Sequence, residues 1–352
     1  MSERTCIIHA GTHKTGTTSL QAFFQQNFAT FGAAGLHVAQ AGRYKMTAPG
    51  GGIGATPGHH ELAWELLDEG RSNLDDLIAE LSQVPHRWAL VSSEDFSLLY
   101  ARPAGLAMLR DGLASIGYTA KIVLYLRAQA SYAESMYGER IKHGHVRSID
   151  FYLQRIVDQG YYLPDGTQQN IAFEYTRLIA PFVEVFGAGN VAVRAYVPSD
   201  DATWIFRDFL SAAGRLEPDF SRTPMQLQIA SPRENEGLSF VNLLGTLHAQ
   251  LQPGVPLPSD AMEFAGRYAP ELSKELALAR YSLLQRDEYV NLLQRFERDN
   301  REIERLFGAH VPFASEADVR PKDDPMWEKA QLERSIFDRC LAAWMGAPSG
   351  HK

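Results

Sequence analysis

Short apolar runs alternate with stretches of helical periodicity over the first two hundred residues. Four of these runs are rich in aliphatic side chains and too short for a helix: residues 5–10, 88–92, 121–126 and 191–196. A continuous apolar run of this length is typical of a strand buried on both faces of a parallel sheet. Because helical segments separate the runs, the pattern predicts an α/β fold, an open parallel β-sheet flanked by helices and joined by right-handed crossovers.

Helical periodicity follows the first apolar run. Apolar residues at helical spacing predict one face of a helix there: Leu20, Phe23, Phe24, Phe28 and Phe31. A further helix is predicted over residues 175–186, before a turn at 187–190. Residues 47–60 are rich in glycine and proline, which favours a mobile loop.

The last third of the chain, from about residue 238 to residue 352, is mostly helical in pattern. Its charged run at 295–305 is expected to form a solvated helix face. No internal repeat and no clean linker divides the sequence. We therefore predict a single α/β domain over residues 1–352 with a helical C-terminal part.

Composition narrows the classes of protein. The 352 residues are 45% hydrophobic and 22% charged, as in an ordinary globular chain. A formal net charge of −8 argues against a general nucleic-acid binder, which needs an excess of Lys and Arg. Cys6 and Cys340 give neither a disulfide framework nor paired metal-ligand spacing. With no signal peptide and no apolar stretch of roughly 20 residues, we expect a soluble, cytoplasmic protein without a transmembrane segment.

A glycine-rich loop directly follows the first predicted strand. In "GTHKTGTTS", Gly11, Gly16 and Thr18 match the phosphate-binding pattern G-x-x-x-x-G-K-[ST], but Thr17 takes the lysine position and Lys14 lies inside the loop. A glycine loop that opens a helix offers unpaired backbone N–H groups and the positive end of the helix dipole to an anion. Side-chain hydroxyls add donors at Thr15, Thr17, Thr18 and Ser19. The sequence therefore predicts a phosphate site whose lysine is displaced from the usual triphosphate position.

Arg127 ends the third predicted strand, and Ser135 follows eight residues later in a helical segment. A guanidinium fork suits a phosphate, and a hydroxyl can donate beside it. Read alone, such an arginine is more often a surface residue or an ion-pair partner. Its position at a strand's carboxyl end, the edge at which open α/β sheets bind ligands, favours a role in binding.

Together these segments resemble sulfotransferases that use 3′-phosphoadenosine 5′-phosphosulfate (PAPS), of the bacterial type with a P-loop sulfotransferase fold. "HKTGTTS" resembles their 5′-phosphosulfate loop, which carries its lysine at this earlier position, and "KIVLYLRAQASYAES" resembles their 3′-phosphate segment. The resemblance covers most of the chain, but only these two motifs are specific. The glycine-rich C-terminal segment of cytosolic aryl and steroid sulfotransferases is not evident, and Asn300 and Arg301 are the candidate substitutes.

The resemblance implies a set of residues that hold PAPS: His13, Lys14, Thr15, Gly16, Thr17, Thr18, Ser19, Arg127 and Ser135. It also implies an enzyme that transfers a sulfuryl group from PAPS to a hydroxyl or amine of a glycan, lipid or small-metabolite acceptor, with no metal required. The acceptor and the oligomeric state stay open.

The transfer reaction needs a base, and two residues compete for that role. Glu94 directly follows the second predicted strand, at a position resembling that of the family's catalytic His or Glu. His60 ends the glycine-rich segment, and histidine is the commonest general base at neutral pH. Helix capping by Glu94, Ser93 or Asp95 is nearly as good an explanation of the segment after the strand. We expect Lys14 to act on the leaving group and His13 to contact the phosphosulfate.

Two rival functions fit the same loop. A P-loop kinase or NTPase with a rearranged loop would use "SSED" as the carboxylate segment that holds magnesium. A non-catalytic nucleotide-binding protein would need the loop but no base. The combination of the loop, Arg127, Ser135 and a candidate base favours an enzyme.

Overall fold

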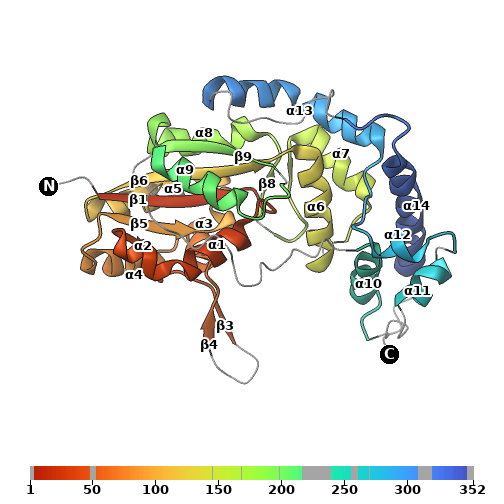
Figure 1. The fold of residues 1–352 in the computed structure, drawn as a ribbon, viewed down its shortest axis with the longest axis horizontal. Helices are drawn as coiled ribbons and strands as arrows, with labels where there is room; N and C mark the ends of the chain where they lie inside the picture. Colours follow the sequence, from red (N-terminus) through yellow and green to blue (C-terminus); the bar gives the residue numbers. More distant parts are fainter. Residues whose placement is uncertain are drawn as a thin grey trace. The chain divides into compact units, whose positions relative to one another are not determined.

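The structure is a computed structural model, and it describes residues 4–47, 53–144, 146–167, 169–197, 199–215, 239–254, 261–268, 270–307 and 319–346 (Figure 1). The chain divides into two compact units. The first comprises Met1–Ala128, Asn170–Pro232 and Asp299–Phe313, and the second comprises Gln129–Gln169, Arg233–Arg298 and Ala314–Lys352. The organisation of the whole chain as one domain stays a prediction.

A five-stranded parallel sheet is the centre of the first unit, with the strand order β2-β5-β1-β6-β9. Its strands are β1 (Arg4–Gly11), β2 (Leu36–Val38), β5 (Trp88–Ser92), β6 (Tyr118–Arg127) and β9 (Val191–Tyr196). All four predicted strands are confirmed. The edge strand β2 escaped prediction because three residues are too few to show a period.

Helices cover both faces of this sheet. On the face where Cys6 and Ile8 of β1 point, the core includes side chains of α3 (His60–Leu67), α4 (Ser72–Gln83), α5 (Pro103–Ser115) and α8 (Tyr175–Phe186). On the face of Ile7, it includes those of α1 (Thr17–Gln26), α2 (Phe28–Ala33) and α9 (Trp204–Arg215). The unit also contains the 3-10 helices η1 (Glu94–Ala101) and η2 (Ala188–Asn190) and the short strand β8 (Ile171–Ala172). The predicted α/β fold is confirmed.

The apolar face predicted from Leu20 to Phe31 is confirmed except at Phe28. Leu20, Phe23, Phe24 and Phe31 belong to one buried cluster. Two helices carry them, because α1 ends before Asn27 and α2 starts after it. The Asn27 side chain donates to the Phe23 carbonyl at 3.1 Å at this break. Phe28 lies 38% exposed, whereas Phe31 is buried.

The glycine-rich segment 47–60 is more ordered than predicted in its described part. Strands β3 (Lys45–Thr47) and β4 (Ile53–Ala55) pair antiparallel, and residues 48–52 lie outside the described residues. Backbone hydrogen bonds close the base of this hairpin, from Tyr44 N to Gly58 O at 3.2 Å and from Thr56 N to Tyr44 O at 2.8 Å. The prediction of a loop was therefore wrong for these residues, since three-residue strands are too short to display alternation.

The second unit is helical apart from β7 (Tyr161–Tyr162) among its described elements. Its helices are α6 (Gln129–Lys142), α7 (Ile149–Gln159), α10 (Phe240–Leu251), α11 (Ala261–Tyr268), α12 (Lys274–Leu278) and α14 (Pro325–Gly346), together with most of α13 (Arg286–Phe307). The predicted helical C-terminal part is confirmed. No helix in the described parts of the chain has both the length and the apolar character that a bilayer span requires.

The predicted solvated helix face at 295–305 is confirmed, with Glu297, Arg298, Arg301, Glu304 and Arg305 exposed on α13. The C-terminal end of this helix belongs to the first unit and also carries one buried charge. Asp299 is buried, and its carboxylate accepts hydrogen bonds from the backbone N–H groups of Tyr175 at 2.6 Å and Thr176 at 3.1 Å. A carboxylate at these orphan donors stabilises the start of α8.

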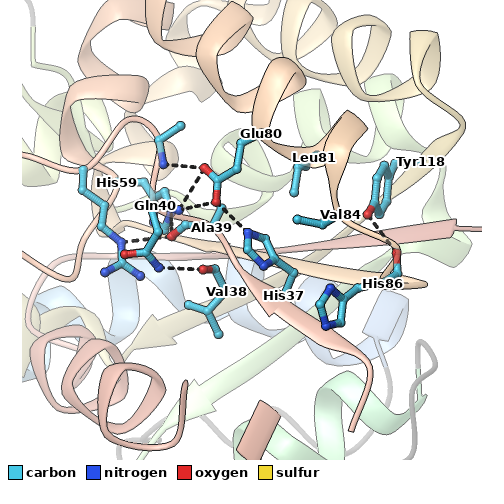
Figure 2. A network of polar contacts seen from close by, with 12 residues as sticks. His37, Val38, Ala39, Gln40, His59, Glu80, Leu81, Val84, His86 and Tyr118 are labelled. Atoms are coloured by element: carbon cyan, nitrogen blue, oxygen red, sulfur yellow. Dashed lines mark hydrogen bonds and ion pairs between the residues drawn. The ribbon is translucent and has the colours of Figure 1, made fainter. Parts of the chain in front are cut away.

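A polar network beside β2 fixes the chain that leads toward the hairpin (Figure 2). The Glu80 carboxylate on α4 accepts hydrogen bonds from His37 Nε2 at 2.6 Å, Gln40 N at 2.9 Å and Ala41 N at 2.7 Å. These bonds lower the pKa of Glu80 against the opposing effect of burial. The segment after β2 is thereby held on α4 although it has no regular structure.

His59 connects this segment to the carboxyl end of β5. Its Nε2 donates to the Ala39 carbonyl at 3.0 Å, and its Nδ1 accepts from the backbone N–H of Ser92 at 3.0 Å. This is the neutral imidazole, and burial together with the charge of Arg43 lowers the pKa of His59 to about 4. Because α3 begins at the next residue, His59 fixes where His60 starts that helix.

We predict that the free energy of unfolding falls between pH 7 and pH 5. His59 and the buried His9, whose pKa burial lowers to about 3, stay neutral in the fold, but they take up protons below pH 6.5 when unfolded. Each should cost about 2 kcal/mol of stability at pH 5. The pKa of His60 is raised in the fold, so its contribution to stability increases as the pH falls. This contribution reduces the total loss of stability between pH 7 and pH 5.

Urea unfolding at pH 7 and pH 5 measures this loss. His59→Gln should remove roughly half of the pH dependence, whereas the control His143→Gln, at a side chain 59% exposed, should leave it unchanged. An equal free energy of unfolding at the two pH values for the unaltered chain would contradict the prediction.

Candidate functional site

The predicted phosphate loop lies between β1 and α1, at the carboxyl end of the sheet. Gly11 closely approaches β6, since a Cβ there would lie 2.8 Å from the Tyr125 carbonyl oxygen, and Thr12 N donates to that oxygen at 2.8 Å. Gly16 has a φ of 77°, which L side chains rarely adopt. The two glycines of the motif therefore satisfy backbone requirements at both ends of the loop.

Lys14 and Arg127 are coupled through the backbone of this loop. Lys14 has a φ of 66°, a left-handed conformation that is uncommon for a residue other than glycine. The Arg127 guanidinium donates to the Lys14 carbonyl at 2.9 Å and so stabilises that conformation. The Tyr175 hydroxyl donates in turn to the Arg127 carbonyl. Arg127, which is 7% exposed, thus braces the loop from the end of β6.

The start of α1 has the features of an anion site. No side chain from the described residues caps this N-terminus, and its first turn contains no acidic residue. The Thr15 hydroxyl donates within the loop, to the Thr12 carbonyl at 2.6 Å. The hydroxyls of Thr12 and Thr17 are buried and meet no hydrogen-bond partner among the described residues. Buried hydroxyls beside orphan backbone donors fit a bound phosphate or sulfate group.

Two further predicted residues of the loop lie at the surface. Thr18 is exposed and Ser19 is partly exposed on the first turn of α1. Both lie within the turn whose backbone N–H groups are unpaired in any helix.

Asp95 joins two histidines beside the loop. One carboxylate oxygen lies 2.9 Å from His13 Nε2, and the other lies 2.8 Å from His60 Nδ1. Ser93 Oγ accepts from the backbone N–H of Asp95 at 3.1 Å, which places the carboxylate at the start of η1. The sequence indicated a capping role for Asp95 or, in the rival kinase or NTPase, a place in the segment that holds magnesium, but no pairing with histidine. Neither neighbouring segment contains a signal for the pairing, because His13 and His60 are distant in the chain.

The electrostatics of this cluster favour a charged carboxylate and a basic imidazole. Burial alone would raise the pKa of Asp95, but the hydrogen bonds and charges of His13 and His60 hold it well below its usual range. Burial alone would lower the pKa of His60, but the hydrogen bond to Asp95 and the charges of Glu94 and Asp95 raise it. Nε2 of His60 makes no hydrogen bond to a described residue, so it is the ring nitrogen that can exchange a proton.

Glu94 and His60, the two candidate bases, lie close to one another. The Gln21 side-chain amide donates to Glu94 Oε2 at 3.4 Å, and a Cβ at Gly58 would lie 2.7 Å from that amide nitrogen and 2.4 Å from His60 Nε2. A side chain at position 58 would clash with both groups, so glycine there leaves room for His60 Nε2 and the Gln21 amide to lie close together. Both candidates belong to the edge of the sheet that holds the phosphate loop.

Ser135 lies in α6 of the second unit, where it is 7% exposed. Its pairing with Arg127 around one phosphate stays a prediction. Among the residues that the structure describes, no group of three or more His, Cys, Asp or Glu side chains is arranged to hold a metal ion.

The fold was compared with those of solved structures, and the sequence with family models and curated proteins. A solved sulfotransferase structure from Alicyclobacillus acidocaldarius has 16% sequence identity with this chain, covers 70% of this chain and 95% of its own, and has a TM-score of 0.40. No protein-family model matches the chain. No curated protein matches its sequence either.

The fold and the site together define an α/β protein with an open parallel sheet, a strand–glycine loop–helix unit suited to an anion, and an acid–imidazole pair beside it.

We predict that Asp95→Asn lowers the pKa of His60. The substitution removes the negative charge and leaves at most a neutral amide oxygen as acceptor for His60 Nδ1, so the effect of burial should dominate. Titration of the imidazole by NMR measures the change directly. The control Glu94→Gln removes only a neighbouring charge and should lower the pKa less, and a pKa for His60 in Asp95→Asn equal to or above that in the unaltered chain would contradict the assignment.

Proposed function

We propose that this chain is a sulfotransferase that moves a sulfuryl group from PAPS to a hydroxyl or amine of an acceptor. The observation that carries the proposal is the Asp95–His60 pair beside a phosphate loop that contains its lysine. An anion-binding loop alone suits many ligands, whereas an imidazole held by an ionised carboxylate adds a base for an acceptor hydroxyl.

The residues of the site fit the donor in the following roles. The first-turn N–H groups of α1 and the buried Thr17 hydroxyl bind the 5′-phosphosulfate, assisted by Thr15, Gly16, Thr18, Ser19 and His13 of the same loop. Lys14 neutralises charge on the leaving phosphate. Arg127 and Ser135 bind the 3′-phosphate, and the bond from Arg127 to the Lys14 carbonyl links that end of the nucleotide to the loop.

The reaction follows from these positions. His60 Nε2 accepts the proton of the acceptor hydroxyl while the acceptor oxygen forms a bond to the sulfur of PAPS. The bond between that sulfur and the phosphate oxygen breaks. The products are the sulfate ester and 3′-phosphoadenosine 5′-phosphate (PAP). Asp95 orients the ring and stabilises the imidazolium that forms. As in phosphoryl transfer, positioning and electrostatic stabilisation supply most of the catalysis.

The rival ATP-dependent reaction needs a carboxylate that helps to hold magnesium near the loop. Asp95 lies at the carboxyl end of the sheet, where such a carboxylate would be needed. Both of its oxygens, however, already accept hydrogen bonds from His13 and His60. Its surroundings therefore suit the orientation of histidine better than the binding of a cation. Competition of PAP against ATP with magnesium in a thermal-shift assay separates the two, and stronger stabilisation by ATP would favour the kinase or NTPase.

We predict that Arg127→Ala removes the preference of the protein for a 3′-phosphate. Calorimetric dissociation constants for PAP and 5′-AMP should differ by roughly 10- to 100-fold in the unaltered protein, as expected for charge-assisted hydrogen bonds. In Arg127→Ala the ratio should approach one. Taking the ratio cancels any general weakening from a loosened loop, because both ligands carry the 5′-phosphate.

The control is Lys14→Ala, which should weaken both ligands and leave their ratio largely intact. If Arg127→Ala keeps the full preference for PAP, the assignment of Arg127 to the 3′-phosphate is wrong.

His60→Ala should abolish most transfer, by roughly 100-fold or more, because it removes the proton acceptor. Glu94→Gln should reduce transfer less, since Glu94 acts on His60 through its charge. Rates with labelled PAPS, measured from pH 5 to pH 9, should rise with pH through the pKa of His60. A larger loss in Glu94→Gln than in His60→Ala would exchange the two roles.

A further inference from the structure

Two large aromatic side chains are exposed next to His60. Tyr44 and Trp64 are each 38% exposed. Their ring centroids lie 5.4 Å apart with an interplanar angle of 69°, and those of Trp64 and His60 lie 5.8 Å apart at 35°. Tyr44, Trp64 and His60 thus form a continuous aromatic row that ends at the proposed base.

The row is held in place by ordered backbone. His60 and Trp64 are four residues apart on α3, so they share one face of that helix. Tyr44 is hydrogen-bonded through its backbone at the base of the β3–β4 hairpin. Leu62 N donates to the Gly42 carbonyl at 3.1 Å, and a Cβ at Gly42 would lie 2.6 Å from Leu62 Cβ, so the segment that leads into the hairpin is in close contact with the helix. The rings are thus exposed, but the backbone that carries them is held by hydrogen bonds.

Polar groups adjoin the end of the row at which the proton is transferred. The amide of Gln21 and the carboxylate of Glu94 lie beside His60, as the bond between them and the position of Gly58 show. Aromatic faces offer apolar contact area, and the amide and carboxylate offer hydrogen bonds. A site with an apolar platform and polar groups at one end suits a ring that has an apolar face and a rim of hydroxyls.

We propose that the aromatic row of Tyr44, Trp64 and His60 binds a sugar ring and directs one of its hydroxyls to His60 Nε2. The C–H face of the sugar packs on Trp64, and the Tyr44 ring, inclined at 69° to that of Trp64, contacts the edge of the sugar. Gln21 and Glu94 bind neighbouring hydroxyls. The acceptor is then a glycoside or glycan. Only the transfer step rests on the proposed sulfotransferase function, because binding of the sugar needs no donor.

Saturation-transfer NMR with methyl glycosides of glucose, galactose and N-acetylglucosamine tests this proposal. At least one glycoside should receive saturation mainly on the protons of one ring face. Trp64→Ala should weaken its binding roughly tenfold, Tyr44→Ala should weaken it less, and Trp64→Phe should restore part of it. Phe28→Ala is the matched control, because Phe28 is also 38% exposed, and it should bind the glycoside as the unaltered chain does.

PAP binding by calorimetry in the same samples reports folding and keeps the two proposals distinguishable. Sugar binding that depends on Trp64 in a protein that fails to bind PAP would support the aromatic row and contradict the sulfotransferase. The proposal is overturned if Trp64→Ala binds PAP and the glycoside normally. It is also overturned if no glycoside binds while 4-nitrophenol does, which would indicate a phenolic acceptor.

Discussion

The buried carboxylate of Asp95 is the interaction on which the site depends. A carboxylate with little access to water is unfavourable unless its oxygens accept hydrogen bonds, preferably from cationic donors. Asp95 meets this requirement with two imidazoles from different parts of the chain, one from the phosphate loop and one from the start of α3. The ring orientation and basicity of His60 follow from the same bonds. The bonds that stabilise the carboxylate therefore also raise the basicity of the His60 imidazole.

The fold brings these residues together through strand ends. In a parallel sheet all carboxyl ends lie along one edge, so the segments after β1, β5 and β6 become neighbours whatever their distance in sequence. The loop after β1 carries His13 and Lys14, the segment after β5 carries Asp95, and Arg127 ends β6. His60 does not follow a strand of this sheet. Its position depends on His59, which fixes the start of α3 with hydrogen bonds to Ala39 and Ser92.

The sequence was most informative about features that depend on residues close to one another in the chain. Apolar runs predicted the four longer strands, and the glycine spacing predicted a phosphate loop. Both predictions were possible because burial and backbone conformation restrict the residue types at consecutive positions. The strand β2 and the β3–β4 hairpin were missed because each strand has three residues. The break at Asn27 was missed because apolar spacing continues across it. The Asp95 pairings and the bond from Arg127 to Lys14 were beyond reach for another reason: they join residues separated by 35 to 113 positions.

In the proposed site, an anion-binding helix start lies beside the His60 imidazole, and the aromatic row extends from His60 toward a ring-shaped acceptor. We propose above all that the start of α1 holds the 5′-phosphate end of a nucleotide with its reactive group facing His60. A crystal structure with bound PAP tests this claim most directly. We predict that the 5′-phosphate lies within hydrogen-bond distance of the Thr17 hydroxyl and the first-turn N–H groups of α1, with Lys14 against it. A PAP molecule bound away from this loop, or a 5′-phosphate pointing away from His60, would contradict the account.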